Sequence, residues 1–427
     1  MSKRLFKDCM ILDGTLNMTV KEHYDILVDH DTIIKIAPRI EDKDAKVYDM
    51  KGSYVVPGLI NMHVHLPAGG KISKKKVANQ TALVGFISKY PLTQKIGIQI
   101  CHNYALLDLY SGTTTVRAVG GITDFDGRLR DSINSGKTIG PRIISCNEAI
   151  GVKGGHMDGT VSRAYATLED AVKQVDVLKA QHADWVKIMI TGGVLDATEV
   201  GHPGVLKMPA EWVKAICDKA HSVGLRVCAH DEGPEGIDIA IKNGVDTIEH
   251  GSLVDETLLP SFKARNGALV CTLSPAVPLS FLDPSVTGYD ETCKINSNAL
   301  FNNMVDMTNK CLQYGVKVGL GTDTGCPFIT HYDMWRELVY FTKYIKNVTP
   351  NFALHTATLV NAEILGLDKQ IGSIEEGKFA DFFFIKSNPL EDLKVLANPL
   401  MVVKNGYIYT KKVKKYQNVE DILNTLI

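Results

Sequence analysis

The chain has 427 residues, of which 45% are hydrophobic and 22% charged, with a formal net charge of -1 at pH 7. This composition is ordinary for a globular protein, and the balanced charge excludes the excess of Lys and Arg that nucleic-acid-binding proteins carry. No stretch reaches the ~18 apolar residues that cross a bilayer, and the N-terminus lacks the apolar segment of a signal peptide. We therefore expect a cytoplasmic protein without nucleic-acid or membrane partners.

The nine cysteines are scattered from Cys9 to Cys326 and include no CxxC pair. An odd count in a chain of this length argues against a disulfide framework, so we expect most of them to be small core residues. Neither Cys228 nor Cys326 is recognisably paired with a base, which argues against a thiol nucleophile.

Both ends of the chain are rich in short extended segments separated by turn residues. Near the start they are residues 10–12, 24–28, 32–36 and 54–56. Near the other end they are residues 382–385, 401–403 and 407–409. The last two flank Asn405-Gly406, which is a strong hairpin signal. We therefore predict one composite β domain, built from residues 1–57 and 368–427.

The middle of the chain alternates short apolar runs with helical patterns, as repeated βα units do. We predict eight strands, at residues 59–65, 113–119, 142–146, 185–190, 225–230, 247–250, 268–273 and 316–323. Helix C-terminal caps are expected just before four of the later strands, at Gly224, Gly244, Gly267 and Gly315. Because eight strands close a barrel, the predicted fold is α/β, with a (β/α)8 TIM barrel over residues 58–367.

Unusual polar residues fall inside or at the ends of these strands. His63 and His65 are two residues apart on one strand, so both imidazoles point to the same side and can meet one metal ion. Lys187 lies within an apolar strand, where its ammonium has to be paired, neutralised or chemically modified. Three later strands end in His230, His250 and Asp323. Each of these is an ordinary strand-end residue by itself, but together they converge on one mouth of a barrel and predict a metal site.

At this point the sequence resembles the amidohydrolase superfamily. The resemblance lies in the segment from Pro57 to His65, in Lys187, and in the single His or Asp residues that end strands 5, 6 and 8. The segments 229–230, 244–252 and 372–381 are similar to the imidazolonepropionase-like and Xaa-Pro dipeptidase-like (prolidase-like) branch. The resemblance covers nearly the whole chain and implies that the two β-rich ends form one composite β-sandwich.

The resemblance also implies a set of metal ligands. His63, His65 and Asp323 would bind the more buried metal ion, and His230 and His250 the second. Lys187 would be carboxylated by carbon dioxide and bridge two zinc ions, although other divalent metals suit these ligands as well. Imidazolonepropionase lacks this lysine and uses one metal, so Lys187 favours a binuclear, dipeptidase-like site. The alternative is a plain amine that is salt-bridged to an acid.

The mechanism follows from the ligand types. A metal-bound water has its pKa lowered from 15.7 toward ~7, so a metal-bridging hydroxide can act as nucleophile while Asp323 serves as general acid and base. We therefore expect a hydrolase that cleaves an amide or peptide-like C–N bond of a small molecule or dipeptide, and from family habit a homo-oligomer. The alternatives are a one-metal cyclic-amide hydrolase or deaminase, and a non-catalytic barrel.

Substrate contacts are less clear from the sequence. His156 resembles the family's substrate-contacting loop histidine, and His202 follows strand 4 in a second glycine-containing loop. Where many dipeptidase-like relatives have an aromatic residue, this chain has Asp231-Glu232, which would repel a carboxylate and attract an ammonium, or would simply begin a helix. Arg117 and Arg163 are the candidate partners for a substrate carboxylate, or they pair with acids of the protein.

Overall fold

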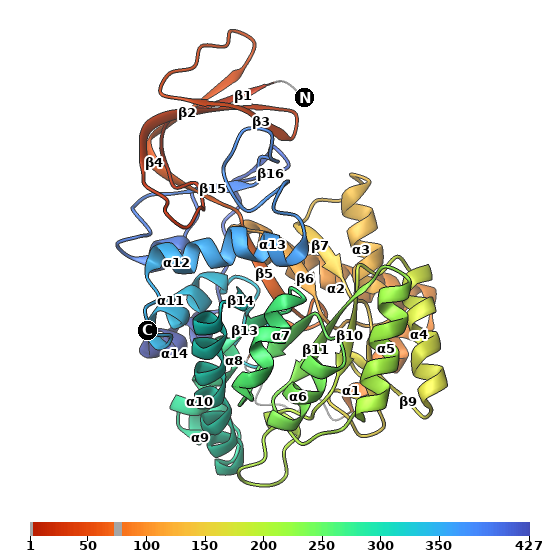
Figure 1. The fold of residues 1–427 in the computed structure, drawn as a ribbon. Helices are drawn as coiled ribbons and strands as arrows, with labels where there is room; N and C mark the ends of the chain where they lie inside the picture. Colours follow the sequence, from red (N-terminus) through yellow and green to blue (C-terminus); the bar gives the residue numbers. More distant parts are fainter. Residues whose placement is uncertain (1–2, 72–78) are drawn as a thin grey trace. The chain divides into compact units, whose positions relative to one another are not determined.

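The computed structural model describes residues 3–71 and 79–427 (Figure 1). Contacts between residues divide the chain into two compact units. The first unit is made of Met1–Asn61, Leu106–Val116 and Tyr332–Lys415, and the second of Met62–Ala105, Arg117–His331 and Tyr416–Ile427. The domain boundaries expected after residues 57 and 367 rest on sequence pattern and not on contacts between residues, so they stay a prediction.

The first unit contains a seven-stranded sheet that is built from both ends of the chain. Its strands are β1 (Arg4–Ile11), β2 (Lys21–Asp29), β3 (Thr32–Ala37), β4 (Lys46–Pro57), β15 (Phe382–Ile385), β16 (Met401–Lys404) and β17 (Tyr407–Tyr409), in the order β17-β16-β15-β4-β1-β2-β3. The two ends meet where β15 pairs with β4, with Phe384 opposite Val55. The predicted composite β domain is therefore confirmed.

This sheet is held by an aromatic core. Phe6, Phe382 and Phe384 are fully buried and in mutual ring contact, with centroid distances between 5.5 and 5.7 Å. The helices of the first unit are α11 (Met334–Tyr344), α12 (Pro350–His355), the π-helical turn η3 (Thr356–Val360), α13 (Asn361–Leu365) and the 3-10 helix η4 (Leu393–Ala397).

The eight predicted barrel strands are all present. They are β5 (Leu59–Val64), β6 (Thr113–Ala118), β7 (Arg142–Ser145), β10 (Trp185–Met189), β11 (Arg226–Asp231), β12 (Thr247–His250), β13 (Ala268–Cys271) and β14 (Lys317–Leu320). Their sheets run in the orders β5-β6-β7 and β14-β13-β12-β11-β10-β8-β9. Two backbone hydrogen bonds join these sheets at β5, from Asp323 N to His63 O at 2.9 Å and from His65 N to Thr324 O at 2.8 Å. The chain thus has the predicted α/β fold of a TIM barrel plus a small β domain.

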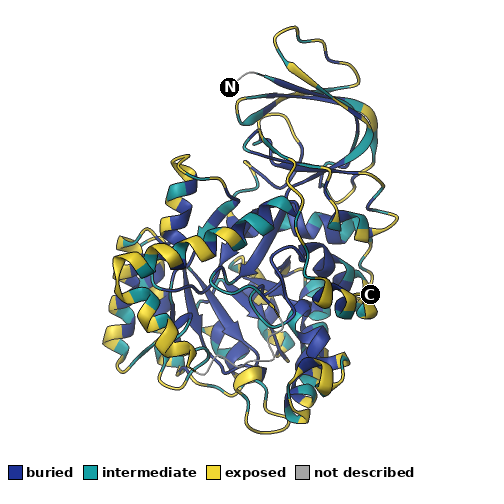
Figure 2. Ribbon diagram, turned by 180° about the vertical axis from the view of Figure 1, so that it is seen from behind, coloured by how far each residue is buried: buried dark blue, intermediate teal, exposed yellow. Residues whose placement is uncertain are grey.

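Helices separate consecutive barrel strands, as the βα pattern requires. They are α1 (Gln80–Lys89), α2 (Pro91–Tyr110), α3 (Phe125–Asn134), α4 (Leu168–Ala180), α5 (Ala210–Ser222), α6 (Pro234–Lys242), α7 (Leu259–Ala264), α8 (Leu273–Phe281), α9 (Pro284–Thr287) and α10 (Glu291–Tyr314), with the 3-10 helices η1 (Val194–Asp196) and η2 (Glu256–Leu258). The chain ends with α14 (Gln417–Leu423) and η5 (Asn424–Leu426). Figure 2 shows the barrel strands as buried and the exposed residues on the helices. None of the described helices is both long and apolar enough to span a membrane.

Two details differ from the sequence-based expectations. The loop after the third strand contains two short strands, β8 (Ala149–Val152) and β9 (Ser162–Tyr165), which carry no clear alternating pattern. Gly267 is not the left-handed residue that ends α7, because Asn266 takes that conformation with φ 58°. Gly267 is needed for a different reason, since a Cβ there would lie 2.1 Å from the ring of Phe262. Gly315 is the left-handed cap of α10, as predicted.

Candidate active site

The barrel strands bring the predicted metal-binding residues to one place. Five of the six lie at a strand, at its end or shortly after it, and are almost completely buried: His63, Lys187, His230, His250 and Asp323. The parallel register of β11 and β12 sets His230 and His250 at similar heights, because Asp231, the residue after His230, is opposite His250. Lys187 in β10 is opposite Cys228, two residues before His230. Side chains from distant parts of the sequence therefore share one end of the barrel.

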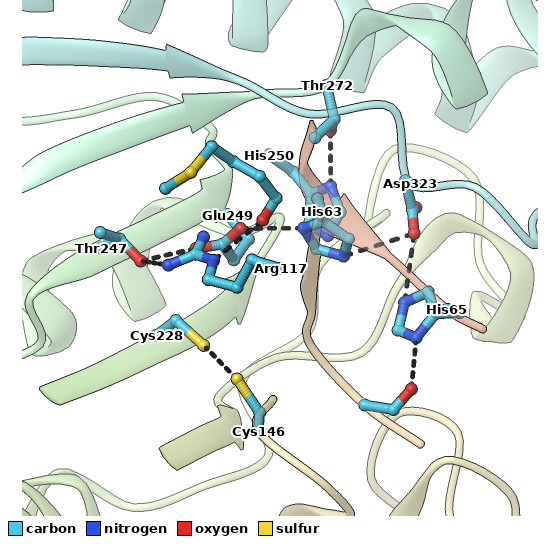
Figure 3. A network of polar contacts seen from close by, with 12 residues as sticks. His63, His65, Arg117, Cys146, Cys228, Thr247, Glu249, His250, Thr272 and Asp323 are labelled. Carbon is cyan, nitrogen blue, oxygen red and sulfur yellow. Dashed lines mark hydrogen bonds and ion pairs between the residues drawn. The ribbon is translucent and has the colours of Figure 1, made fainter. Parts of the chain in front are cut away.

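His63, His65 and Asp323 form the first cluster (Figure 3). Oδ1 of Asp323 lies 3.4 Å from Nε2 of His63 and 3.2 Å from Nε2 of His65. The three atoms thus converge on a single point, as ligand atoms around one cation would.

Among the residues that the structure describes, two overlapping groups have the geometry to hold a metal ion. One consists of His63, His250 and Asp323, and the other of His230, Glu232 and His250, with the ligand atoms of each group within 4.8 Å of one another. His250 belongs to both groups, so the two positions are adjacent. Glu232, which the sequence placed among substrate contacts, is here also close enough to be a ligand.

Each imidazole has one nitrogen occupied by a protein group, which leaves the other for a metal. Nδ1 of His63 lies 2.9 Å from Glu249, Nδ1 of His65 lies 2.9 Å from the carbonyl of Gly120, and Nδ1 of His250 lies 2.7 Å from Oγ1 of Thr272. In His230 the roles are exchanged, because Nε2 lies 3.2 Å from the carbonyl of Gly192. Such contacts fix the ring orientation of metal-ligating histidines.

Burial keeps the imidazoles of His63, His230 and His250 neutral at physiological pH. It lowers the pKa of His63 to about 4, with Lys187 adding to the effect, and holds the pKa values of His230 and His250 well below the usual range. Burial alone would raise the pKa of Asp323, but the neighbouring histidines outweigh it and lower that pKa well below its ordinary value. Neutral imidazoles and an ionised carboxylate are the forms that bind cations, so the donor set fits a divalent metal.

Glu249 is a residue of the site that sequence reasoning missed. It is fully buried, its Oε2 contacts His63, and its Oε1 accepts a hydrogen bond from Nη2 of Arg117 at 2.7 Å (Figure 3). Arg117 also donates to the carbonyl of Met62 and to Oγ1 of Thr247. Two opposite charges within apolar barrel strands are the signal that could have revealed this pair.

Lys187 is buried, and within the described part of the chain its Nζ has no hydrogen-bond partner. The alternative expectation, an amine salt-bridged to an acid, therefore finds no support in the geometry. An ammonium buried without a partner is costly, so the position calls for an anionic partner or for chemical modification of the amine.

The backbone is unusual at two of the predicted ligands. His250 and Asp323 have φ values of 69° and 55°, in the left-handed region that residues other than glycine seldom adopt. At His250 this breaks the alternation of the strand, so both Glu249 and His250 contact the ring of His63, the latter with centroids 4.8 Å apart. Backbone strain of this kind is concentrated at functional sites.

A cavity opens beside these residues and is lined by His230, His250, Asp323, Glu232 and His156, among others. The ring of His156 stacks on that of His230 with centroids 4.0 Å apart, and its Nδ1 is hydrogen-bonded to Asp196.

The remaining substrate candidates fall in different places. Val194 N donates to Oε2 of Glu232 at 2.8 Å, and burial raises the pKa of Glu232 to about 8. Asp231 is buried against Gly233 and Gly236 and is not one of the residues lining the cavity. His202 is exposed and is not one of those residues either, so its contact with substrate stays a prediction.

Both candidate arginines pair with acids of the protein. Arg117 is held by Glu249 as described, and Nε of Arg163 lies 2.7 Å from Oε2 of Glu148. Cys326 also lines the cavity, and its thiol donates to Oδ2 of Asp323 at 3.2 Å. Burial raises the pKa of this thiol well above its usual value, which agrees with the expectation that it is no nucleophile.

Comparison with known proteins places this arrangement in context. Residues 54–408 match the sequence model of the amidohydrolase family. The solved structure of a Bifidobacterium longum protein thought to be a prolidase is 33% identical, with a TM-score of 0.86 over 99% of this chain and 98% of that one. A Xaa-Pro dipeptidase with methionine in its active site is 30% identical, with a TM-score of 0.81 over 96% of this chain and 100% of the dipeptidase. Ochratoxinase of Aspergillus niger is 27% identical over 329 residues, which span 70% of this chain and 66% of that relative.

Proposed function

Because the chain belongs to the amidohydrolase family and is an enzyme that acts on carbon–nitrogen bonds, we propose that it hydrolyses an amide bond of a small, dipeptide-like molecule at a site with two zinc ions. One ion would be held by His63, His65 and Asp323, and the other by His230 and His250. When bound, the metal ions supply hydroxide at neutral pH and polarise the scissile carbonyl.

Lys187 would connect the two metal positions. Its amine adds to carbon dioxide with loss of one proton, and the resulting carbamate is an anion that two cations can share. The support for this step is the buried Nζ, which has no hydrogen-bond partner among the described residues. Carboxylation replaces an unpaired buried cation by a paired anion, so it removes the cost that the plain amine carries.

Asp323 would transfer the proton. Its Oδ1 faces His63 and His65, while its Oδ2 faces the cavity side and accepts a hydrogen bond from Cys326. A carboxylate in this position accepts a proton from the nucleophile and passes it to the leaving nitrogen. His156, stacked on His230 at the cavity wall, would contact the bound substrate.

The observation that carries the proposal is the convergence of His63, His250 and Asp323 beside a second group that contains His230. The histidines are neutral and the carboxylate of Asp323 is ionised, which are the forms that bind a cation. A one-metal cyclic-amide hydrolase or deaminase would need only one of these two positions. Two metal ions per chain thus favour the proposed site, and one favours the alternative.

The test combines metal analysis with two variants. We expect Asp323→Asn to retain most of its metal but to lose more than about 99% of turnover, because general acid–base groups contribute roughly 10²–10⁴-fold. We expect His63→Ala to lose its metal, so that its loss of turnover follows from the loss of metal. The readouts are zinc per chain by elemental analysis and hydrolysis of a panel of small amides and dipeptides. Full activity of Asp323→Asn would contradict the role given to this residue.

A further inference from the structure

The cavity beside the candidate metal residues has a wall of one chemical type. It is lined by His230, His250 and Asp323, and also by a wall of residues from α8 and α10. Apart from Ser297, the side chains of this wall are apolar: Pro275, Ala276, Leu279, Leu300 and Met304. This apolar wall faces the cavity, so apolar groups of a substrate bound there would contact it.

Apart from three histidines, the ionisable side chains among the described residues that line the cavity are two carboxyls and one thiol. None of its lining residues, as far as the chain is described, is Lys or Arg. The carboxyl groups at its surface are those of Glu232 and Asp323, and neither the ionised nor the protonated form of a carboxyl offers positive charge. His156 is already hydrogen-bonded to Asp196. Arg117 and Arg163 are engaged by Glu249 and Glu148, away from the lining.

A substrate carboxylate that enters the cavity would therefore lose its hydration and find no cationic side chain to replace it. It would instead face an acid or the apolar wall. Both situations are unfavourable, because an unpaired charge loses its hydration and like charges repel. An uncharged apolar group would instead gain contacts with Leu279, Leu300 and Met304.

We propose that the enzyme prefers amides whose groups beyond the scissile bond are apolar and carry no carboxylate, so that dipeptides with a blocked C-terminus are better substrates than free dipeptides. This inference rests on the proposed amide hydrolysis and specifies its substrate class. It also distinguishes this chain from an enzyme that recognises the terminal carboxylate of a dipeptide.

Kinetics on a matched pair of substrates test the preference. For zinc-loaded enzyme, we expect kcat/KM for leucyl-phenylalaninamide to exceed that for leucyl-phenylalanine by about ten-fold or more, because the free carboxylate would face an acid or the apolar wall without a cationic side chain to pair with. Equal values, or a preference for the free carboxylate, would overturn the inference while leaving amide hydrolysis intact.

Binding of two hydroxamates gives a readout that does not depend on turnover. Pentanohydroxamate and the monohydroxamate of adipic acid share the metal-binding group but differ in whether the tail ends in a carboxylate. We expect the apolar tail to bind more tightly by calorimetry. If neither peptide is hydrolysed but this order holds, the proposed function fails and the pocket preference stands. Equal affinities, or binding of neither compound, overturn the preference.

A variant at the cavity mouth completes the test. Leu195 lines the cavity and is 41% exposed, so its replacement should not disturb the core. Leu195→Arg adds the missing cation and should shift the ratio of kcat/KM values toward the free dipeptide by several-fold. Leu195→Gln adds a polar group without charge and is the matched control. An unchanged ratio in Leu195→Arg would count against the inference.

Discussion

Nδ1 of His63 lies 2.9 Å from Oε2 of Glu249, which links a predicted metal ligand to a fully buried ion pair with Arg117. Burial raises the pKa of Glu249, but Arg117 and His63 outweigh it and hold that pKa below the ordinary value. The carboxylate therefore stays ionised and keeps the His63 ring in one orientation. A side chain that never touches the metal can in this way control its binding.

Glu249→Gln should weaken metal binding and destabilise the fold. The amide keeps the size of the side chain but leaves Arg117 as an uncompensated buried charge, which costs about 3–5 kcal/mol. Loss of the carboxylate behind a ligating histidine lowers metal affinity by roughly 10–100-fold. Metal retained after dialysis and the thermal unfolding temperature measure the two effects.

A second Arg–Glu pair provides the control for this variant. Glu148 pairs with Arg163, whose side chain is 53% exposed. Glu148→Gln should change stability by less than about 1 kcal/mol and leave metal content unaltered, because water compensates an exposed charge. Equal effects of the two substitutions would show that Glu249 has no special part in the site.

Lys187→Met should act in opposite directions on the metal-free and metal-loaded protein. Without metal, an apolar side chain replaces a buried amine that has no hydrogen-bond partner among the described residues, so the unfolding temperature should rise. With zinc supplied, the variant should bind about one ion in place of two, because the bridging carbamate cannot form. The exposed Lys35→Met in β3 is the control and should change neither quantity. A less stable metal-free Lys187→Met protein would indicate a partner for this amine in solution.

Asp126 should make the metal-free protein less stable as the pH rises. Burial raises the pKa of Asp126 from 3.8 to about 7, and neither carboxyl oxygen has a hydrogen-bond partner in the described chain. At a pH between these two pKa values, Asp126 has lost its proton in the unfolded chain but keeps it in the folded chain. The free energy of unfolding therefore falls with increasing pH and levels off above about pH 7. Unfolding temperatures in EDTA from pH 4 to about 8 measure the slope.

Two substitutions isolate the contribution of Asp126 to this slope. Asp126→Asn removes the ionisable group and should flatten the profile, with the larger gain in stability at the alkaline end. Asp131→Asn, on the exposed side of the same helix α3, should leave the slope in place. An identical slope in the wild type and in Asp126→Asn would assign the effect to other groups.

Much of this architecture could be predicted because it depends on local patterns. The strands predicted at 185–190 and 247–250 are present as β10 and β12, and the Asn405-Gly406 turn lies between β16 and β17. The convergence of His63 with His250 also followed from topology, since parallel strands of a barrel carry their carboxyl ends to one mouth.

Other features depend on contacts that no local pattern encodes. Glu249 lies one residue before His250, and strand alternation would place the two on opposite faces. The left-handed backbone at His250 brings both side chains to His63. The sequence does not predict a left-handed conformation at a residue other than glycine. Likewise, Asp231 and Glu232 are equivalent acids in the sequence, but only Glu232 is among the residues that line the cavity.

Gly321→Ala should disrupt the metal site without any change in a charged residue. Gly321 follows β14, and a Cβ at this position would lie 2.6 Å from Cβ and 2.7 Å from N of His63, too close for the backbone of β5 to stay in place. Displacement of His63 alters the distance between its ring and Asp323. A misplacement of about 1 Å in an active site lowers turnover by roughly 10²-fold. Gly85→Ala in α1, where a Cβ meets nothing within 4 Å, is the control and should keep full activity. Metal content and kcat of the two variants decide the matter, and an active, zinc-loaded Gly321→Ala protein would mean that β5 can move without consequence for the site.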